Sequence, residues 1–332
     1  MRKASVIFVA GGETLIGAAI LRVLKQQGFE NVLGGPGEHI DLCNATAVES
    51  FFARHRPEYV FHAGGRSGGI AANTKWPADL AYDNLLGSVH VVHAAHTTGV
   101  QRLLYLASSC SYPRLCPQPM QEAMILTGPL EPTNEAYAVA KLAGMKLCQA
   151  YRQQYGDEFF VGIPANAFGP GDDFSPEDSH VIAALVRRFH EAKLRGDAVV
   201  SIWGSGRPRR EFIYADDLAD ACIFAIEHYR DAAPLNLGGG TDLSIAELAE
   251  KIRAIVGFTG KLEFDVSRPD GMPLKSLDSS KLLSLGWRPT LDIEDGLRRT
   301  YEDFVNAPAG PAVCRSSPAP AGPAPAERGI GN

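Results

Sequence analysis

Short apolar runs alternate with longer amphipathic segments through the first two thirds of the chain. The apolar runs have the length of buried strands and occupy residues 5–10, 59–65, 102–108 and 159–166. Apolar residues at helical spacing predict helices from residue 15 to Gly28 and over 43–54, 79–97 and 136–155. Strands that alternate with crossover helices predict an α/β fold with a Rossmann-like, doubly wound parallel sheet.

The pattern loosens after about residue 170, where we expect a second, smaller unit. We assign residues 1–170, with 211–240 returning to them, to a dinucleotide-binding domain. Residues 171–210 and 241–305 are assigned to a C-terminal substrate-binding lobe, in which 244–257 has helical spacing. Residues 306–332 are rich in Ala, Pro and Gly, which predicts a disordered tail.

Composition changes this picture little but excludes several partners. A net charge of -6 gives no general attraction to nucleic acid or to an anionic membrane. The apolar run at the N-terminus ends in glycines before it reaches the length of a signal peptide, so we expect a cytoplasmic protein. The 6 cysteines form no C-x-x-C pair, and His90, His93 and His96 have no acidic or thiol companion. We therefore expect free thiols and no metal.

A glycine-rich turn joins the first predicted strand to the first helix. Gly11, Gly12 and Gly17 stand where dinucleotide sites need a tight turn and a close approach of backbone to pyrophosphate. Thr14 occupies the position of the middle glycine in the usual motif. The loop alone is compatible with a dinucleotide site and equally with a simple strand-to-helix turn.

A second group of residues favours the dinucleotide site. Tyr137 and Lys141 are four residues apart on a predicted helix and therefore share one face. A lysine beside a phenol favours the phenolate, which makes the tyrosine a general acid or base. Ser108 ends a predicted strand, so its hydroxyl can join the pair. Together with the glycine loop, these residues are a specific signal that favours a catalytic dinucleotide site.

Cys110 lies among hydroxyl residues at the end of the same predicted strand. Because it follows Ser108 by two residues, the two side chains would share a face of an extended strand. Its thiol could then act as a base on a bound substrate. The alternative is that Cys110 is a small apolar residue of the core, as most free cysteines are.

The sequence resembles the extended short-chain dehydrogenase/reductases, and within them the GDP-L-fucose synthases. The resemblance covers residues 5 to about 305 and is carried by "SGGIAAN" (67–73), "SSCSYP" (108–113), "LEPTNEAYAVAKLAG" (130–144), "WGSGRPRREF" (203–212) and "RPDGMPLKSLD" (268–278). It implies 3,5-epimerisation and then NAD(P)H-dependent 4-reduction of GDP-4-dehydro-6-deoxy-D-mannose to GDP-L-fucose. It also implies a homodimer, for which the helices 79–97 and 136–155 have the apolar content.

The resemblance assigns roles to residues by position. Catalytic roles in reduction fall on Ser108, Tyr137 and Lys141, and those in epimerisation on Cys110 and His180. The implied cofactor contacts are Gly11, Gly12, Glu13, Thr14, Leu15, Ile16, Gly17, Asp41, Leu42, Leu106, Ala107, Ser108, Ser109, Lys141, Pro164, Ala165, Asn166, Ala167 and His180. The implied substrate contacts are Asn166, Arg188, Trp203, Arg210 and Asp270. Trp203 could also be a core residue of a strand.

The sequence departs from the resemblance at the cofactor. Members of the family carry arginines that bind the 2'-phosphate of NADP in the glycine loop and after the second strand. Here the loop has Glu13, and the segment 33–42 has no arginine but offers Glu38 to a ribose. We expect NADP(H) as cofactor, with NAD(H) as the alternative.

Other functions of the same fold are kept as alternatives. The substrate could be a related 4-keto sugar nucleotide, or the chain could be another epimerase or dehydratase of sugar nucleotides. A dehydratase is expected to have an Asp-Glu pair after its serine or threonine, where this chain has Ser109 and Cys110. A non-catalytic dinucleotide sensor would have no reason to combine Tyr137, Lys141, Cys110 and His180.

Overall fold

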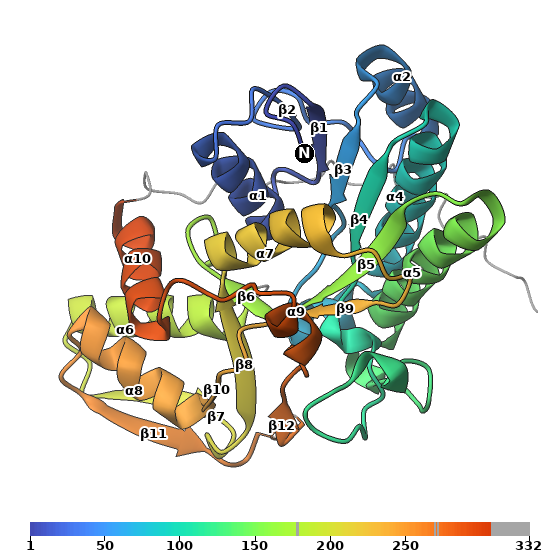
Figure 1. Cartoon of the computed structure of the whole chain (residues 1–332). Helices are drawn as coiled ribbons and strands as arrows, with labels where there is room; N and C mark the ends of the chain where they lie inside the picture. Colours follow the sequence, from blue (N-terminus) through green and yellow to red (C-terminus); the bar gives the residue numbers. More distant parts are fainter. Residues whose placement is uncertain (177–178, 269, 271, 307–332) are drawn as a thin grey trace, which may run out of the picture.

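A parallel sheet of six strands forms the larger part of the molecule (Figure 1). The computed structural model describes residues 1–176, 179–268, 270 and 272–306, so the predicted tail lies outside the described residues except for Asn306, which ends a helix. The strand order is β2-β1-β3-β4-β5-β9, and all neighbours are parallel. The strands are β1 (Val6–Ala10), β2 (Asn31–Leu33), β3 (Tyr59–His62), β4 (Arg102–Leu106), β5 (Phe159–Pro164) and β9 (Leu235–Leu237).

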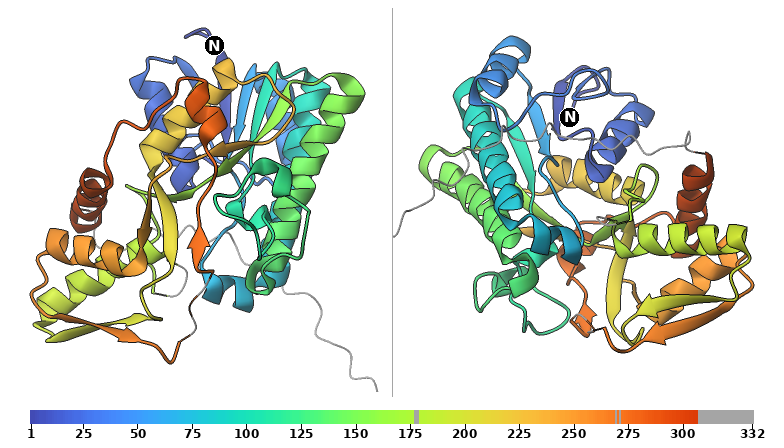
Figure 2. Two further views of the ribbon diagram at one scale, coloured as in Figure 1. Left: turned by 60° about the horizontal axis from the view of Figure 1, so that its bottom comes forward. Right: turned by 180° about the vertical axis from the view of Figure 1, so that it is seen from behind.

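Helices cover both faces of this sheet, which confirms the predicted doubly wound fold. Helices α1 and α7 pack together on one face, and α2, α4 and α5 cover the other (Figures 1 and 2). The helices are α1 (Leu15–Gln26), α2 (Ala45–His55), α3 (Ile70–Lys75), α4 (Pro77–Thr98), α5 (Glu135–Tyr155) and α7 (Ala215–His228). The predicted helices 43–54, 79–97 and 136–155 agree with α2, α4 and α5 to within two residues at each end.

A second group of elements packs around its own core. Strand β8 (Arg209–Tyr214) pairs with β6 (Asn166–Phe168), β10 (Asp242–Ser244) and β12 (Leu274–Lys275). Strand β7 (Val199–Trp203) pairs with β11 (Lys261–Asp265), and the helices are α6 (Val181–Arg195), α8 (Ile245–Val256) and α10 (Ile293–Asn306). Phe189 and Leu248 are fully buried in this core. The predicted strand 159–166 is divided here, because β5 ends at Pro164 and β6 pairs in the second sheet.

One segment of the predicted lobe packs with the large sheet instead. Leu277, Leu282 of α9 (Ser280–Ser284) and Trp287 belong to the core of the six-stranded sheet. The Trp287 indole N–H donates to Asp220 Oδ2 of α7 over 2.9 Å, which ties the segment there. Residues 277–287 therefore pack with the large sheet, and the domain boundaries stay a prediction.

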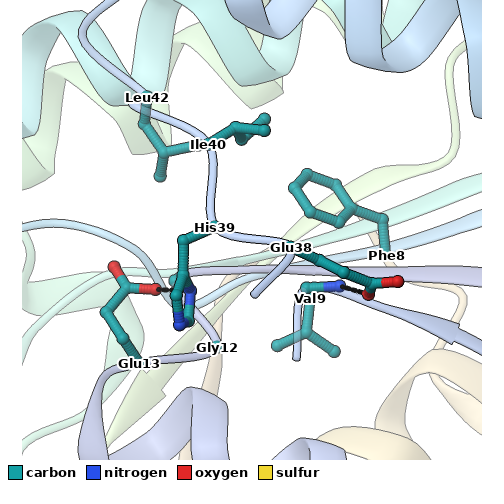
Figure 3. A pocket seen from close by; sticks show the side chains of 10 residues that line it. Phe8, Val9, Gly12, Glu13, Glu38, His39, Ile40 and Leu42 are labelled. Carbon is teal, nitrogen blue, oxygen red and sulfur yellow. Dashed lines mark hydrogen bonds and ion pairs between the residues drawn. The ribbon is translucent and has the colours of Figure 1, made fainter. Parts of the chain in front are cut away.

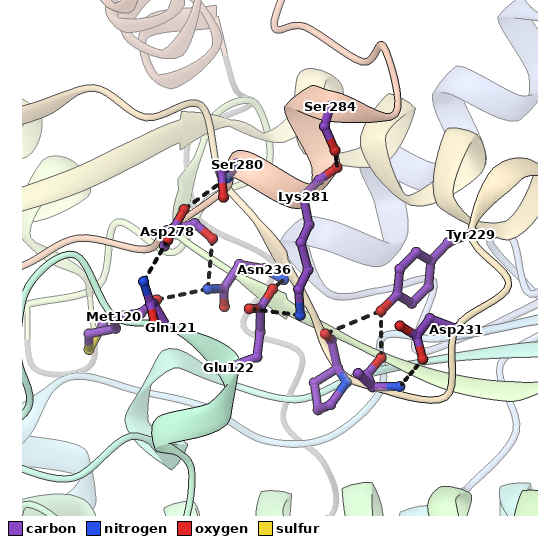
Figure 4. Close-up of polar contacts among 12 residues, drawn as sticks. Met120, Gln121, Glu122, Tyr229, Asp231, Asn236, Asp278, Ser280, Lys281 and Ser284 are labelled. Carbon is purple, nitrogen blue, oxygen red and sulfur yellow. Dashed lines mark hydrogen bonds and ion pairs between the residues drawn. The ribbon is translucent and has the colours of Figure 1, made fainter.

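A polar network holds the loop after β4 against the segment that follows β12 (Figure 4). The amide of Asn236 on β9 donates to the carbonyl oxygens of Met120 and Asp278 over 2.9 and 3.0 Å. Glu122 accepts from the Asn236 backbone N–H and pairs with Lys281 Nζ at 3.1 Å. The network ties Asp278 and Lys281 to β9 of the large sheet.

The three histidines of α4 serve separate hydrogen bonds. His90 Nδ1 contacts the Leu42 carbonyl oxygen at 2.9 Å, His93 the Tyr151 hydroxyl at 2.8 Å, and His96 Asp157 at 2.8 Å. Within the described ranges, no group of His, Cys, Asp or Glu side chains is arranged to hold a metal ion. No helix in that part of the chain is long and apolar enough to cross a membrane.

Candidate active site

The glycine loop brings backbone atoms into close contact at the start of α1. Gly11 has φ +85°, and a Cβ there would lie 2.2 Å from Gly64 Cα. A Cβ on Gly17 would lie 1.9 Å from the Gly11 carbonyl oxygen, so neither position admits a side chain. The Thr14 hydroxyl caps α1 by accepting from the Gly17 N–H over 3.0 Å. This leaves a helix N-terminus and a tight turn that fit a pyrophosphate.

The three residues predicted for reduction lie together at the carboxyl end of β4. Lys141 Nζ donates to the carbonyl oxygens of Gly64 and Leu106, each over 3.3 Å, and thus spans the ends of two strands. The Tyr137 hydroxyl is hydrogen-bonded to the side chain of Ser108. The structure therefore places Ser108, Tyr137 and Lys141 in one cluster.

Burial sets the protonation of this cluster. Desolvation raises the pKa of Tyr137 above its ordinary value of 10.0, a charge on Cys110 raises it further, and the hydrogen bond from Ser108 lowers it. Desolvation lowers the pKa of Lys141 from 10.5 to about 8. The expected effect of Lys141 on Tyr137 is therefore not seen: the phenol keeps its proton, so it is ready to act as a donor.

The predicted extended geometry at Cys110 is wrong. Strand β4 ends at Leu106, and Ser109–Ser111 form a 3-10 turn, η1. The Ser108 hydroxyl caps this turn by accepting from the Cys110 N–H over 3.2 Å. Because serine hydroxyls compete for backbone N–H groups in this way, the chain turns instead of continuing the strand.

Two donors hold the sulfur of Cys110. Asn134 Nδ2, at the N-terminus of α5, donates to Cys110 Sγ over 3.2 Å. Lys275 Nζ, on β12, donates to the same sulfur over 3.5 Å. The thiol is partly accessible and does not belong to the buried core, which argues against the packing interpretation.

His180 lies within electrostatic reach of Lys275. It is the N-cap residue of α6 and its side chain is exposed at the surface. Desolvation by the groups around the ring lowers the pKa of His180, Asp173 raises it, and the positive charge of Lys275 lowers it. Lys275 is thus within electrostatic reach of both residues predicted for epimerisation.

Three of the residues predicted for the substrate lie on β6, α6 and β8, and each donates a hydrogen bond to a backbone carbonyl oxygen. Asn166 Nδ2 donates to the Glu211 carbonyl oxygen over 2.8 Å, and Arg188 donates to the Ser201 carbonyl oxygen. Arg210 donates to the Met272 carbonyl oxygen over 2.6 Å, opposite Lys275 in the β8–β12 pair. Desolvation lowers the pKa of both arginines, which stay cationic and are positioned by backbone carbonyls.

The other two predicted substrate residues lie at the end of β7. Trp203 is not a core residue, since 65% of its side chain is exposed, and the Arg268 guanidinium lies 5.0 Å from its ring centroid. Asp270 accepts from the Ser205 backbone N–H and hydroxyl over 2.7 and 2.6 Å. These hydrogen bonds lower the pKa of Asp270, with Arg207 and Arg210 adding to the effect.

The remaining predicted cofactor residues border the same edge of the large sheet. Asp41 and Leu42 follow β2, with Leu42 facing Gly64, while Leu106 to Ser109 end β4. Pro164 ends β5, and the Ala165 N–H donates to the Leu237 carbonyl oxygen over 3.0 Å before β6 takes up Asn166 and Ala167. Glu13 to Ile16 lie in the glycine turn and the first turn of α1.

Sequence reasoning gave no role to Lys275 or Asn134. Both lie inside motifs that carry the family resemblance, "RPDGMPLKSLD" and "LEPTNEAYAVAKLAG". The only available signal was therefore their place in a motif, since their contact with Cys110 joins residues 165 and 24 positions apart.

A family model decides the classification. The model for the NAD dependent epimerase/dehydratase family matches residues 7–238, more than half of the chain. The chain belongs to this family. The match spans the glycine loop, the Ser108 cluster, His180 and the strand of Arg210.

Individual relatives are similar to this chain over nearly its whole length. The chain is 51% identical over 305 residues to a putative GDP-L-fucose synthase 2 of Arabidopsis thaliana, covering 92% of this chain and 93% of the relative. It is 44% identical over 308 residues to the GDP-L-fucose synthase of Escherichia coli K12, covering 90% and 96%. A solved GDP-mannoheptose C4 reductase from Campylobacter jejuni with NADP bound has a TM-score of 0.83 and 34% identity, covering 92% and 99%.

Proposed function

We propose that this chain is a GDP-L-fucose synthase. It would epimerise GDP-4-dehydro-6-deoxy-D-mannose at C3 and C5 and then reduce C4 with a nicotinamide dinucleotide. The observation that carries the proposal is the contact of Cys110 with Lys275 beside the Ser108, Tyr137 and Lys141 cluster. One site thereby combines a base for epimerisation with a proton donor for reduction. The identities of 51% and 44% to proteins named for this activity support it.

The dinucleotide fits the glycine loop and the ends of β1, β3 and β4. The N-terminus of α1 would hold the pyrophosphate, and Lys141 would reach the ribose next to the nicotinamide. NADP(H) is supported by the C. jejuni relative with NADP bound. When bound in reduced form, the cofactor supplies hydride.

In the reduction, Ser108 and Tyr137 would bind the oxygen at C4. The Tyr137 phenol, protonated because burial raises its pKa, gives its proton to this oxygen as negative charge develops there. Lys141 lies one helical turn away, and its Nζ, held by the carbonyl oxygens of Gly64 and Leu106, would bind the ribose hydroxyls beside the phenol.

In the epimerisation, the 4-keto group acidifies the hydrogens at C3 and C5, and Cys110 would remove them. The sulfur accepts from the Lys275 ammonium and the Asn134 amide, so both donors lie beside the atom that would take the proton. His180 would return a proton from the other face of the sugar. Because its pKa is lowered, only a minor fraction is imidazolium at neutral pH, but its exposed side chain can take a proton from water.

Two variants test this division of labour. Cys110→Ser should lose most exchange of the C3 and C5 hydrogens with deuterated water but still reduce a 4-keto sugar nucleotide that needs no epimerisation. Tyr137→Phe should show the opposite pattern. His180→Ala should impair completion of epimerisation more than nucleotide binding. Exchange at the wild-type rate in Cys110→Ser would leave the proposed epimerase without its base.

A related 4-keto sugar nucleotide is the second candidate. The observation that favours it is the similarity in structure to a GDP-mannoheptose C4 reductase, which differs in the sugar. The higher identity to the fucose synthases ranks it second.

The proposal includes a homodimer and a cytoplasmic location. Helices α4 and α5 pack together, and they expose Tyr82, Val89 and Val139, with 62%, 46% and 48% of these side chains accessible. Exposed apolar side chains on two adjacent helices suit a two-fold contact with a second copy. The net charge of -6 gives no reason to expect nucleic acid or anionic membrane as a partner.

A further inference from the structure

A pocket beside the glycine loop has no lysine or arginine among its described lining residues, although the 2'-phosphate of NADP calls for a basic side chain. It lies at the carboxyl end of β2 and is lined by the end of β1, the glycine loop, Gly34, Glu38, His39, Ile40 and Leu42 (Figure 3). In doubly wound folds, the ribose of the adenosine moiety is held in this place. Its side chains therefore decide whether the 2' position carries a hydroxyl or a phosphate.

Two carboxylates flank the pocket. Glu38, at one side, accepts with Oε2 from the Gly34 N–H over 3.1 Å. Glu13, at the other side, lies with Oε2 3.2 Å from His39 Nδ1 (Figure 3). Among the described residues that line this pocket there is no lysine or arginine.

A 2'-phosphate is poorly matched to these side chains. A phosphate monoester carries about -1.5 to -2 charges at neutral pH and is bound best by the planar fork of an arginine. Here it would meet Glu13 and Glu38, and His39 already faces Glu13. A free 2'-hydroxyl instead needs an acceptor, which either carboxylate can provide.

The contacts of Glu38 and Glu13 also stabilise the local backbone. They leave the negative charges of both carboxylates at the pocket. Glu38 closes the turn after β2, and Glu13 joins the glycine loop to His39. In both cases the carboxylate stays at the pocket. Arg66, which follows β3, is occupied by Asp79, whose Oδ2 lies 3.7 Å from its guanidinium.

We propose that this pocket accepts an adenosine ribose with a free 2'-hydroxyl, so that NADH serves as reductant and binds at least as tightly as NADPH. Glu13 and Glu38 are the residues that determine this specificity. The inference deepens the proposed function and rests on it only for the need of a nicotinamide dinucleotide.

The direct test is equilibrium binding, with no sugar nucleotide present. The full chain is titrated with NADH and with NADPH by isothermal titration calorimetry at one fixed ionic strength, because charge effects depend on salt. The expected Kd for NADPH is equal to or higher than that for NADH. A Kd for NADPH at least tenfold lower would overturn the inference and leave the proposed function intact. Binding of neither dinucleotide would overturn both.

Charge variants identify the residues. In Glu13→Gln, the ratio of the Kd for NADPH to the Kd for NADH should fall roughly three- to tenfold, because one repulsive charge is removed. Glu13→Arg should lower the ratio further, since a bidentate donor is added. Glu263→Gln is the control, because it makes the same change of net charge on β11, outside the large sheet. It should leave the ratio unchanged. An unchanged ratio in both Glu13 variants would overturn the assignment to Glu13.

Discussion

Removing the positive charge of Lys275 should slow the exchange of the C3 and C5 hydrogens. Its Nζ lies 3.5 Å from Cys110 Sγ. At this distance, opposite unit charges attract by about 1 kcal/mol in bulk water and about 5 kcal/mol at an effective dielectric constant of 20. Because both side chains are half-buried, we take about 1–3 kcal/mol, which corresponds to a loss in exchange rate of roughly 5- to 160-fold.

The same substitution has an effect of opposite sign on His180. Lys275 lowers the pKa of His180, so Lys275→Met should raise it and increase the imidazolium fraction at neutral pH. More imidazolium would speed the return of a proton. A net loss of exchange therefore indicates that the contact with the sulfur dominates.

The assay follows deuterium at C3 and C5 by NMR in heavy water, without reductant. Lys275→Met should show the loss, and Lys275→Arg should keep most of the rate because it keeps the charge. Lys261→Met is the control for the change in side chain. Lys261 is an exposed residue of β11, and this variant should exchange the hydrogens at the wild-type rate. An exchange rate in Lys275→Met within twofold of wild type would refute the role of the ammonium.

Two further predictions concern stability and assembly. Burial lowers the pKa of Lys141 to about 8 from 10.5, so its ammonium destabilises the fold below pH 8, and this cost disappears as the pH rises from 8 through 10.5. Lys141→Met should therefore abolish reduction yet stabilise the protein at pH 7 by about 1–3 kcal/mol, and by much less at pH 10, as thermal unfolding would show. If α4 and α5 form the dimer interface, Tyr82→Arg with Val89→Arg should convert a dimer into a monomer in light scattering. A wild-type monomer at micromolar concentration would contradict the interface.

Features that depend on local pattern were predictable from the sequence. Helix α1 has buried Ile20, Val23 and Leu24 at helical spacing, and the apolar runs gave the central strands of the sheet. The pairing of Tyr137 with Lys141 follows from a helix of 3.6 residues per turn. These features are set within a few neighbouring residues, so the sequence alone was sufficient.

Features that depend on contacts between distant segments were not predictable. The position of the Cys110 sulfur depends on such a contact, because Asn134 at the start of α5 donates to it from 24 residues away. Lys275 reaches Cys110 only because β12 pairs with β8 and the loop of Met120 anchors the segment after it. Trp287 packs with the large sheet, where its indole N–H donates a hydrogen bond to Asp220. Each of these depends on tertiary packing.

The central claim is that one site both epimerises and reduces a GDP-linked 4-keto sugar. The most direct measurement is to incubate the full chain with GDP-4-dehydro-6-deoxy-D-mannose and reduced dinucleotide and to identify the product sugar by NMR. We expect GDP-L-fucose, with deuterium at C3 and C5 when the reaction runs in heavy water. A product reduced at C4 but with the configuration of C3 and C5 unchanged would contradict it.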